Sequence, residues 1–328
     1  MIIAVDAVGG DKYPENPVKG AIQATEENKA LSVILVGPES LVQKELANHT
    51  YDENRILVED APQIIEMDES PAQAVKSKQK SSIAVGLKLH KEGAANAFVS
   101  AGNTGALLAA STLLLGKLEG VMRPTIAATY PTIKGFRLLL DVGANLEVRP
   151  EMLYQFALMG SIYTEQVMGI ENPRLGLLNV GEEEEKGTEE IRESFDLLSE
   201  LPNFIGNIEG RDILFGKADV YLCDGFVGNL ILKFGESIPN ALRELINPAI
   251  KQLDLDEVQA KTVGKVLETA VGTFNYERVG GVPFLGVNGV SMVGHGGSTP
   301  LAVKNMIFNA VKCVENNINE LIIASLNE

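Results

Sequence analysis

The stretch Ala95-Asn-Ala-Phe-Val-Ser-Ala-Gly-Asn-Thr-Gly-Ala-Leu107 joins a short apolar run, a glycine turn and the start of a helical pattern. Such a run is typical of a strand buried on both faces of a parallel sheet. Residues 218–230 repeat this order, with the first Ala, both turn glycines and the final Leu identical. We therefore expect a duplicated strand–turn–helix unit whose two turns face one cleft, although so short an echo can also arise by chance.

Similar apolar runs recur along the chain, and most precede glycine or asparagine and a helical pattern. The predicted strands are Ile2–Asp6, Val33–Gly37, Ile56–Val58, Ala97–Ala101, Ile126–Tyr130, Leu138–Val142, Leu175–Val180, Phe204–Ile208, Val220–Cys223 and Ser291–Gly294. Helix starts are predicted at Asn16-Pro17, Ser70-Pro71 and Thr299-Pro300, where a capping residue precedes proline. The alternation predicts an α/β fold with about ten mostly parallel strands. No linker rich in Pro, Gly or Ser divides residues 1–328, so we expect one intertwined unit.

The composition excludes several classes of protein. The 328 residues are 45% apolar and 22% charged, and 28 basic against 44 acidic residues give a net charge of −16. This balance argues against nucleic-acid binding and against charge-driven binding to anionic membranes. Two distant cysteines give no disulfide framework, and three histidines leave little material for a zinc site. The sequence shows no signal peptide and no spanning segment, so we expect a cytoplasmic protein.

Five glycine-containing loops follow predicted strands, where open α/β sheets usually bind ligands. They are Asp6–Asp11, Ser100–Gly105, Asp141–Asn145, Asp224–Asn229 and Gly294–Ser298. Glycine lets the backbone approach a ligand, and the following helix presents N–H groups and a positive dipole end. Any one of these loops can be a purely structural turn. Together they indicate an anion site that needs few basic residues.

Familiar cofactor signatures are missing from the sequence. It contains no G-x-G-x-x-G after a strand, no phosphate-binding G-x-x-x-x-G-K-[S/T] and no H-E-x-x-H. Asn103, Asn145, Asn179 and Asn229 recur at the turns and could donate amide hydrogens to an oxyanion, or could simply favour the turn. Lys186, in an acidic loop, is either an anion ligand or a charge-balanced surface lysine. His295 is either a donor or acid–base group, or a structural residue.

Residues 237–271 are predicted to form a helical hairpin, because apolar residues recur there at helical spacing. Core packing or a dimer contact explains this pattern most simply. The apolar positions Leu255 and Val258 at the connecting tip leave docking to a membrane or to a partner as the alternative.

The loops resemble those of the bacterial phosphate acyltransferase (PlsX) family over essentially the whole chain. The matching segments are Val5–Asp11, Ser100–Gly105, Arg123-Pro-Thr, Asp141–Asn145, Asn179-Val-Gly-Glu-Glu, Asp224–Asn229 and His295–Ser298, with Val8 where methionine is expected. The resemblance implies a three-layer fold like that of phosphotransacetylases and isocitrate dehydrogenases, built from two intertwined subdomains. It also implies a homodimer, loose membrane association, and no metal or nucleotide cofactor.

The implied reaction converts acyl-acyl-carrier-protein (acyl-ACP) and inorganic phosphate into acyl phosphate and free ACP, for phospholipid synthesis. The product would pass to a membrane glycerol-3-phosphate acyltransferase. Lys186, Asn229 and His295 are then the expected catalytic residues. The expected substrate- or phosphate-binding residues are Asp6, Gly9, Gly10, Asn103, Thr104, Gly105, Asn145, Asn179, Asp224, Gly225, Gly296 and Ser298. Candidate cations for docking the acidic carrier are Lys76, Lys78, Lys80, Arg123, Lys134 and Arg137.

Three other functions stay open at this point. A phosphotransacylase would use acyl-CoA, and a nicotinamide-dependent decarboxylating dehydrogenase can share the fold, although no metal-binding aspartate cluster is evident. A non-catalytic sensor would bind an acyl or phosphate ligand without turning it over.

Overall fold

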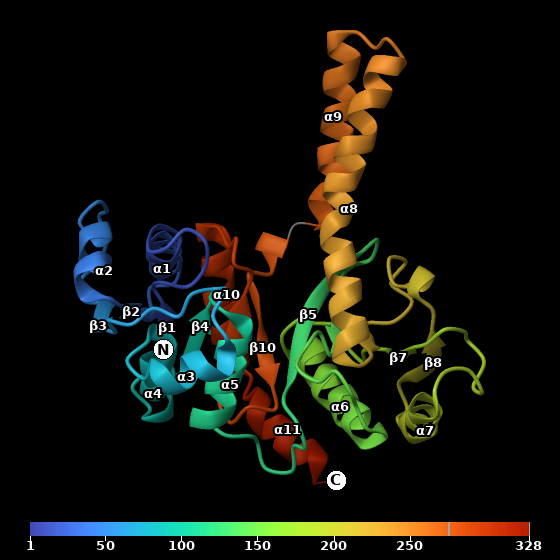
Figure 1. Ribbon diagram of the computed structural model, residues 1–328, viewed down its shortest axis with the longest axis horizontal. Coiled ribbons are helices and arrows are strands. Elements are labelled where there is room, and N and C mark those ends of the chain that lie inside the picture. Colours follow the sequence, from blue (N-terminus) through green and yellow to red (C-terminus); the bar gives the residue numbers. More distant parts are fainter. Residues whose placement is uncertain (275, 328) are drawn as a thin grey trace. The chain divides into compact units, whose positions relative to one another are not determined.

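Strands and helices alternate through the computed structural model, which describes residues 1–274 and 276–327 (Figure 1). Within these residues the strands are β1 (Ile2–Asp6), β2 (Ser32–Gly37), β3 (Ile56–Asp60), β4 (Ala97–Ser100), β5 (Thr125–Thr132), β6 (Gly135–Leu140), β7 (Leu175–Leu178), β8 (Phe204–Ile208), β9 (Val220–Leu222), β10 (Gly281–Leu285) and β11 (Ser291–Gly294). The α-helices are α1 (Glu15–Glu27), α2 (Glu39–Leu46), α3 (Pro71–Ser77), α4 (Ser82–Lys91), α5 (Thr104–Leu114), α6 (Pro150–Gln166), α7 (Glu189–Leu198), α8 (Gly225–Gln252), α9 (Glu257–Val271), α10 (Pro300–Glu315) and α11 (Ile318–Leu326).

The chain forms two units, and each is assembled from separate stretches of sequence. Unit 1 comprises residues 1–127, 155–172 and 276–328, and unit 2 comprises residues 128–154 and 173–275. The predicted α/β class is confirmed. The interleaved ranges explain why no linker marks a boundary in the sequence.

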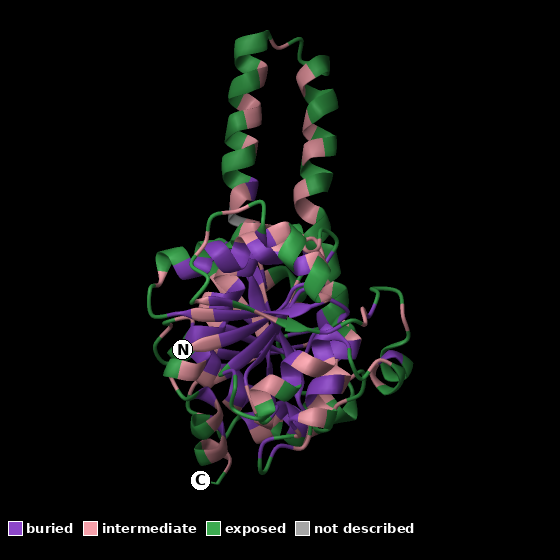
Figure 2. Cartoon of the chain, turned by 90° about the vertical axis from the view of Figure 1, so that its left-hand side faces the viewer, coloured by how far each residue is buried: buried purple, intermediate pink, exposed green. Residues whose placement is uncertain are grey.

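Unit 1 contains the strand order β3-β2-β1-β4-β11-β10, and β10 pairs with the first residues of β5. The neighbours from β3 to β11 are parallel, whereas β10 is antiparallel to both β11 and β5. Helices α1 and α10 pack together, as do α4 and α5. Strands β1 and β4 are almost entirely buried, which explains their continuous apolar sequence (Figure 2).

Strand β5 continues into unit 2, where the order is β5-β6-β9-β7-β8. β6, β9, β7 and β8 are parallel neighbours, so their carboxyl ends lie at one edge. Helix α8 packs against β6 at its first turns. The sheet in this unit therefore presents the loops after β6, β7 and β9 together.

All ten predicted strands are present, and β10 was missed. Its sequence, Gly281-Val-Pro-Phe-Leu285, contains two residues that normally weaken a strand. Pro283 nevertheless stands opposite Met292 in the antiparallel pair. Strand β10 forms because Phe284 and Leu285 are buried, a tertiary effect that the local pattern does not contain.

The three predicted helix caps have different outcomes. Thr299 caps α10, since its hydroxyl accepts the N–H of Ala302 at 3.4 Å. Ser70 precedes α3 as predicted, but its side chain makes no capping hydrogen bond. The Asn16 prediction was wrong, because α1 begins at Glu15 and the Asn16 side chain instead donates to the carbonyl oxygen of Ser298.

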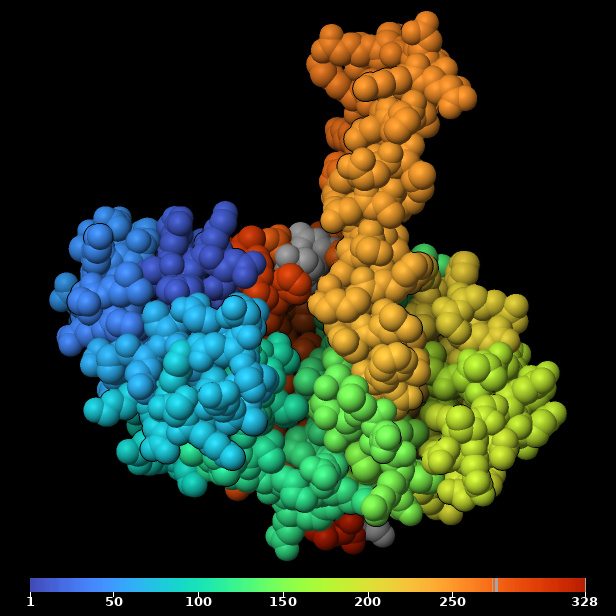
Figure 3. All heavy atoms as spheres, in the orientation of Figure 1, coloured from blue at the N-terminus to red at the C-terminus, as the bar shows by residue number. Residues whose placement is uncertain are grey.

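Helices α8 and α9 form a long hairpin that extends away from the sheet of unit 2 (Figures 1, 2 and 3). The hairpin was predicted from residue 237, but α8 already begins at Gly225 and continues through Pro239 and Pro248. Two hydrogen bonds from Arg243 to Glu268 join its helices. Only Gly225, Gly228 and Gly235 of α8 and Val271 of α9 are buried. Most of the hairpin's apolar side chains are therefore not covered by this chain.

Candidate functional site

Three loops of unit 1 meet where the parallel strands β1, β4 and β11 end. The N–H of Asp11 donates to the carbonyl oxygen of Gly296 at 2.8 Å, and this joins the loop after β1 to the loop after β11. Gly10 has a φ of +95°, and a Cβ there would lie 2.8 Å from the same oxygen. Only glycine fits this position without strain. The predicted residues Gly9, Gly10 and Gly296 are thus brought together.

Asp6 supports these loops from within the protein. Its buried carboxylate accepts hydrogen bonds from the Ser100 hydroxyl at 2.6 Å and from the N–H of Val8 at 3.1 Å. The Ser100 oxygen in turn accepts the N–H of Gly102. Burial raises the pKa of Asp6 above its ordinary value, and the hydrogen bonds it accepts offset part of that rise. The carboxylate therefore orders the backbone that faces the site.

Asn103 caps helix α5 at the same edge. Its side-chain oxygen accepts the N–H of Ala106 at 3.0 Å. Its amide nitrogen lies within 3.2 Å of three carbonyl oxygens, those of Glu66, Met67 and Glu69. The side chain is occupied by the fold, so this loop can offer a ligand the backbone N–H groups of the first turn, at Thr104 and Gly105.

His295 and Ser298 form a tight turn after β11. The Ser298 hydroxyl donates to the carbonyl oxygen of His295 at 2.6 Å, and Ser298 is buried. The exposed His295 ring accepts the N–H of Gly297 at Nδ1, 3.1 Å away. In the neutral ring the proton is then carried by Nε2. Nε2 of His295 can thus act as a hydrogen-bond donor.

Asp141 supports the loop after β6 in unit 2. Its fully buried carboxylate accepts the backbone N–H of Asn145 at 2.6 Å and the Asn145 side-chain amide at 3.0 Å. Our sequence predictions included Asn145 but missed Asp141. The signal was available, because Asp6 and Asp141 each lie at the carboxyl end of an apolar run and precede a glycine turn.

The first turn of α8 lies directly on this loop. The N–H of Gly225 donates to the carbonyl oxygen of Asn145 at 2.7 Å, and Asp224 caps the helix by accepting the N–H of Val227. Gly143 has a φ of +122°, and a Cβ built on it would lie 3.8 Å from Cβ of Asn229. Asn229 is exposed, and its side chain makes no hydrogen bond within residues 1–274 and 276–327. Its amide is free to meet a ligand beside the Gly143 turn.

The loop after β7 carries Lys186. The Asn179 side chain closes this loop by donating to the carbonyl oxygen of Lys186 at 3.1 Å, while its oxygen accepts the N–H of Val180. Lys217 pairs with Glu182, and the Asn207 side chain donates to the carbonyl oxygen of Glu183. In the described part of the chain the exposed Lys186 ammonium forms no ion pair.

The two predicted halves of the site are therefore each assembled within one unit. Unit 1 contributes Asp6, Gly9, Gly10, Asn103, Thr104, Gly105, His295, Gly296 and Ser298, and unit 2 contributes Asn145, Asn179, Lys186, Asp224, Gly225 and Asn229.

The similar sequences of residues 95–107 and 218–230 form two corresponding strand–helix units, β4–α5 and β9–α8. Its residue alignment was wrong by two positions after the strand. Asn103 caps α5 six residues after β4 begins, whereas Asp224 caps α8 four residues after β9 begins. Gly102 precedes its cap and Gly225 follows its cap, so these two glycines are not equivalent.

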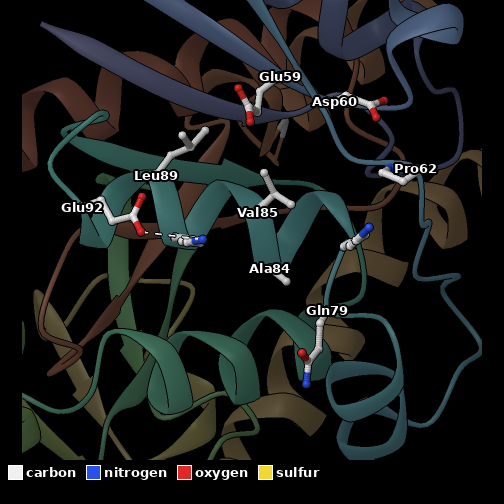
Figure 4. A pocket seen from close by; sticks show the side chains of 10 residues that line it. Glu59, Asp60, Pro62, Gln79, Ala84, Val85, Leu89 and Glu92 are labelled. Carbon is white, nitrogen blue, oxygen red and sulfur yellow. Dashed lines mark ion pairs between the residues drawn. The ribbon is translucent and has the colours of Figure 1, made fainter.

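A hollow of 390 Å³ lies apart from these loops, beside β3 and α4 (Figure 4). It is lined by Glu59, Asp60, Lys80, Lys88 and Glu92 around a few apolar side chains, and Lys88 pairs with Glu92. None of the predicted site residues lines it. Across the described residues, no group of three or more His, Cys, Asp or Glu side chains could hold a metal ion.

Solved structures with the same fold include several phosphotransacylases. A phosphotransacetylase from Streptococcus pyogenes matches with a TM-score of 0.65 and 14% identity, over 96% of this chain and 94% of its own. A branched-chain phosphotransacylase from Enterococcus faecalis matches with a TM-score of 0.56 and 13% identity, over 96% and 98%. At such identities the likeness shows the fold alone. The predicted phosphotransacetylase-like fold is confirmed.

Sequence relatives are much more similar. A phosphate acyltransferase from Chlorobaculum parvum is 46% identical over the whole chain and 99% of its own length. A phosphate acyltransferase from Heliobacterium modesticaldum is 47% identical over the whole chain and 97% of its length. The model of one family, described as "Fatty acid synthesis protein", matches residues 1–321. The chain therefore belongs to this fatty acid synthesis family, and the resemblance to bacterial phosphate acyltransferases seen in its loops is confirmed.

Proposed function

We propose that this protein is an acyltransferase that moves an acyl group from acyl-ACP to inorganic phosphate. The observation that carries the proposal is the full-length identity of 46–47% to proteins named phosphate acyltransferase. The glycine loops at the strand ends of both units suit this activity. They offer backbone N–H groups and amides to an anion in a chain of net charge −16.

The reaction needs little covalent help from the protein. A phosphate oxygen attacks the thioester carbonyl carbon, the carbon–sulfur bond breaks, and the carrier leaves as a thiolate. The protein has to position the reactants and to stabilise the oxyanion of the tetrahedral intermediate. Lys186 and Asn229 are the proposed donors to phosphate or oxyanion, because both are exposed at neighbouring strand ends of unit 2. His295 and the first turn of α5 are the donors proposed in unit 1.

The carrier protein is the proposed acyl donor, and it needs a local basic surface because it is acidic. Of the predicted docking cations, Lys78 pairs with Glu69, and Arg137 pairs with Asp219 at 2.7 Å. These two charges are already neutralised. Lys76, Lys80, Lys134 and Arg123 are exposed. We assign the carrier contact to this exposed set.

The hairpin of α8 and α9 is the proposed contact of a homodimer. Along its length the hairpin carries Leu245 and Val266, which are 70% and 64% exposed. Covering these side chains with the same hairpin of a second copy would remove a large apolar area from water.

No described helix is long and apolar enough to cross a membrane. For the loose membrane association we propose the hairpin tip around Leu255 and Val258. From there acyl phosphate would be passed to a membrane glycerol-3-phosphate acyltransferase for phosphatidic acid synthesis.

The choice of acyl donor is tested by comparing long-chain acyl-ACP with the matching acyl-CoA, at the same phosphate concentration. We expect a higher kcat/KM for acyl-ACP, and Lys80→Glu should raise KM for acyl-ACP only. A preference for acyl-CoA would identify a phosphotransacylase instead. Binding of both thioesters without turnover would identify a sensor.

A further inference from the structure

Three large apolar side chains form a line on the first turns of α8. Phe226, Leu230 and Phe234 are 64%, 63% and 68% exposed. Residues four apart lie one above the other on a helix, so the three form a continuous stripe, here called the α8 stripe. At a rise of 1.5 Å per residue the stripe is about 12 Å long.

The α8 stripe faces away from the sheet of its own unit. The opposite side of the helix carries the buried residues Gly225, Gly228 and Gly235. A Cβ on Gly228 would lie 1.8 Å from the carbonyl oxygen of Asp141, and one on Gly235 would lie 2.5 Å from the Tyr130 hydroxyl. The helix is therefore held tightly against β5 and β6 by its glycine side.

The stripe begins where the proposed anion loops end. Phe226 directly follows Gly225, whose N–H donates to the carbonyl oxygen of Asn145. Asn229 lies within the same turn, beside Gly143. Lys233, the cation nearest to the stripe along the helix, pairs with Glu236 at 2.9 Å. A ligand on the stripe would thus meet apolar surface along the helix and polar donors at its start.

We propose that the α8 stripe binds the hydrocarbon chain of the acyl substrate. The thioester carbonyl would lie at the start of α8, and the chain would run along Phe226, Leu230 and Phe234. This assignment rests on the proposed function, which requires a long apolar group attached to a carbon that phosphate attacks. It also explains why side chains of this size remain uncovered beside a polar site.

A contact assay can test the stripe without depending on turnover. The chain contains no tryptophan, so Phe234→Trp introduces a single fluorophore on the stripe. Palmitate brominated at mid-chain quenches tryptophan on contact, and we expect saturable quenching of this variant. The matched control is Phe215→Trp, at a position of the same unit that is 63% exposed and has no proposed contact. We expect it to be quenched much less. Equal quenching of the two variants would overturn the proposal, and so would an absence of quenching in Phe234→Trp.

Turnover provides a second, independent measurement. For acyl-ACP donors of increasing length, kcat/KM should rise by up to about fourfold per methylene buried. Phe226→Ser and Phe234→Ser should flatten this dependence of kcat/KM on chain length. An unchanged dependence would overturn the stripe assignment even if acyl phosphate forms. Quenching without turnover would support the stripe and contradict the proposed function. Loss of the dimer in these variants would show instead that the stripe contacts a second copy.

Discussion

At the scale of single residues, Lys186 and Asn229 are the side chains proposed to donate to phosphate or to the oxyanion. Neither supports the fold through its side chain in the described residues, so Lys186→Ala and Asn229→Ala should leave the melting temperature unchanged. Each should lower kcat by about 10²–10³, the usual cost of removing one oxyanion donor. Steady-state kinetics with acyl-ACP measures this. Lys265→Ala, which removes an exposed lysine of α9, should have no effect. Unchanged turnover in both variants would contradict the proposed roles of Lys186 and Asn229.

His90 should make stability depend on pH. Its Nε2 accepts the N–H of Val290 at 2.9 Å, and its Nδ1 lies 3.1 Å from the carbonyl oxygen of Ala95. Burial lowers the pKa of His90, against the smaller raising effect of the Ala95 contact. The folded state therefore binds fewer protons here than the unfolded chain does. The stabilising contribution of neutral His90 is complete well above pH 6.5, the unfolded pKa, and falls as the pH drops below it.

Replacing His90 isolates this contribution from that of the carboxylates. His90→Gln should lower the free energy of unfolding at pH 8 by about 1–3 kcal/mol, because buried hydrogen bonds are lost. Urea unfolding at pH 8 and pH 5.5 should show a smaller difference between wild type and variant at the lower pH. A difference that grows on acidification would contradict the neutral, buried ring.

The sequence located the five glycine loops but not the roles of their side chains. Glycine after a strand was enough to predict all five loops. The carboxylates of Asp6 and Asp141, and the amide of Asn103, turn inward to hold backbone groups. That distinction depends on contacts with residues up to 94 positions away, as between Asp6 and Ser100. Local pattern does not record such contacts.

At the scale of elements, two glycines of the hairpin should respond in opposite ways to the same change. Gly228 packs on the backbone directly after β6, where a Cβ would lie 1.8 Å from the carbonyl oxygen of Asp141. Gly264 lies on α9 with open space around it. Gly228→Ala should destabilise the protein by about 3 kcal/mol, whereas Gly264→Ala should stabilise the helix by about 1 kcal/mol. Denaturant unfolding of the two variants measures this, and equal effects would contradict the close packing of α8 on β6.

Element type was predictable where burial is uniform and harder to predict where it is not. Strands β1, β4 and β9 have continuous apolar sequences because nearly all of their residues are buried. Strand β10 contains Gly281 and Pro283, and the first turns of α8 contain Gly225 and Gly228, so both look interrupted in the sequence. Close packing requires glycine in both elements, since a Cβ on Gly281 would lie 2.7 Å from Met306 and one on Gly228 would lie 1.8 Å from Asp141. These residues interrupt the local sequence pattern, so neither β10 nor the start of α8 is recognised from it.

At the scale of the whole molecule, the hairpin should determine the oligomeric state. Leu245 and Val266 are 70% and 64% exposed, so charges there are compatible with the folded chain. The double variant Leu245→Glu/Val266→Glu should convert a dimer into a folded monomer, because charges at a desolvated contact are costly. Light scattering after gel filtration gives the mass, and circular dichroism checks the fold. A wild type that is monomeric at micromolar concentration would contradict the dimer.

The central claim is that phosphate accepts the acyl group. The most direct measurement incubates the protein with long-chain acyl-ACP and phosphate fully labelled with ¹⁸O, and follows the products by mass spectrometry. We expect acyl phosphate that retains all the labelled oxygens, formed in equal amount with free ACP, because a phosphate oxygen attacks the carbonyl carbon. Release of free fatty acid at a rate independent of phosphate would contradict the claim, since water would then be the acceptor.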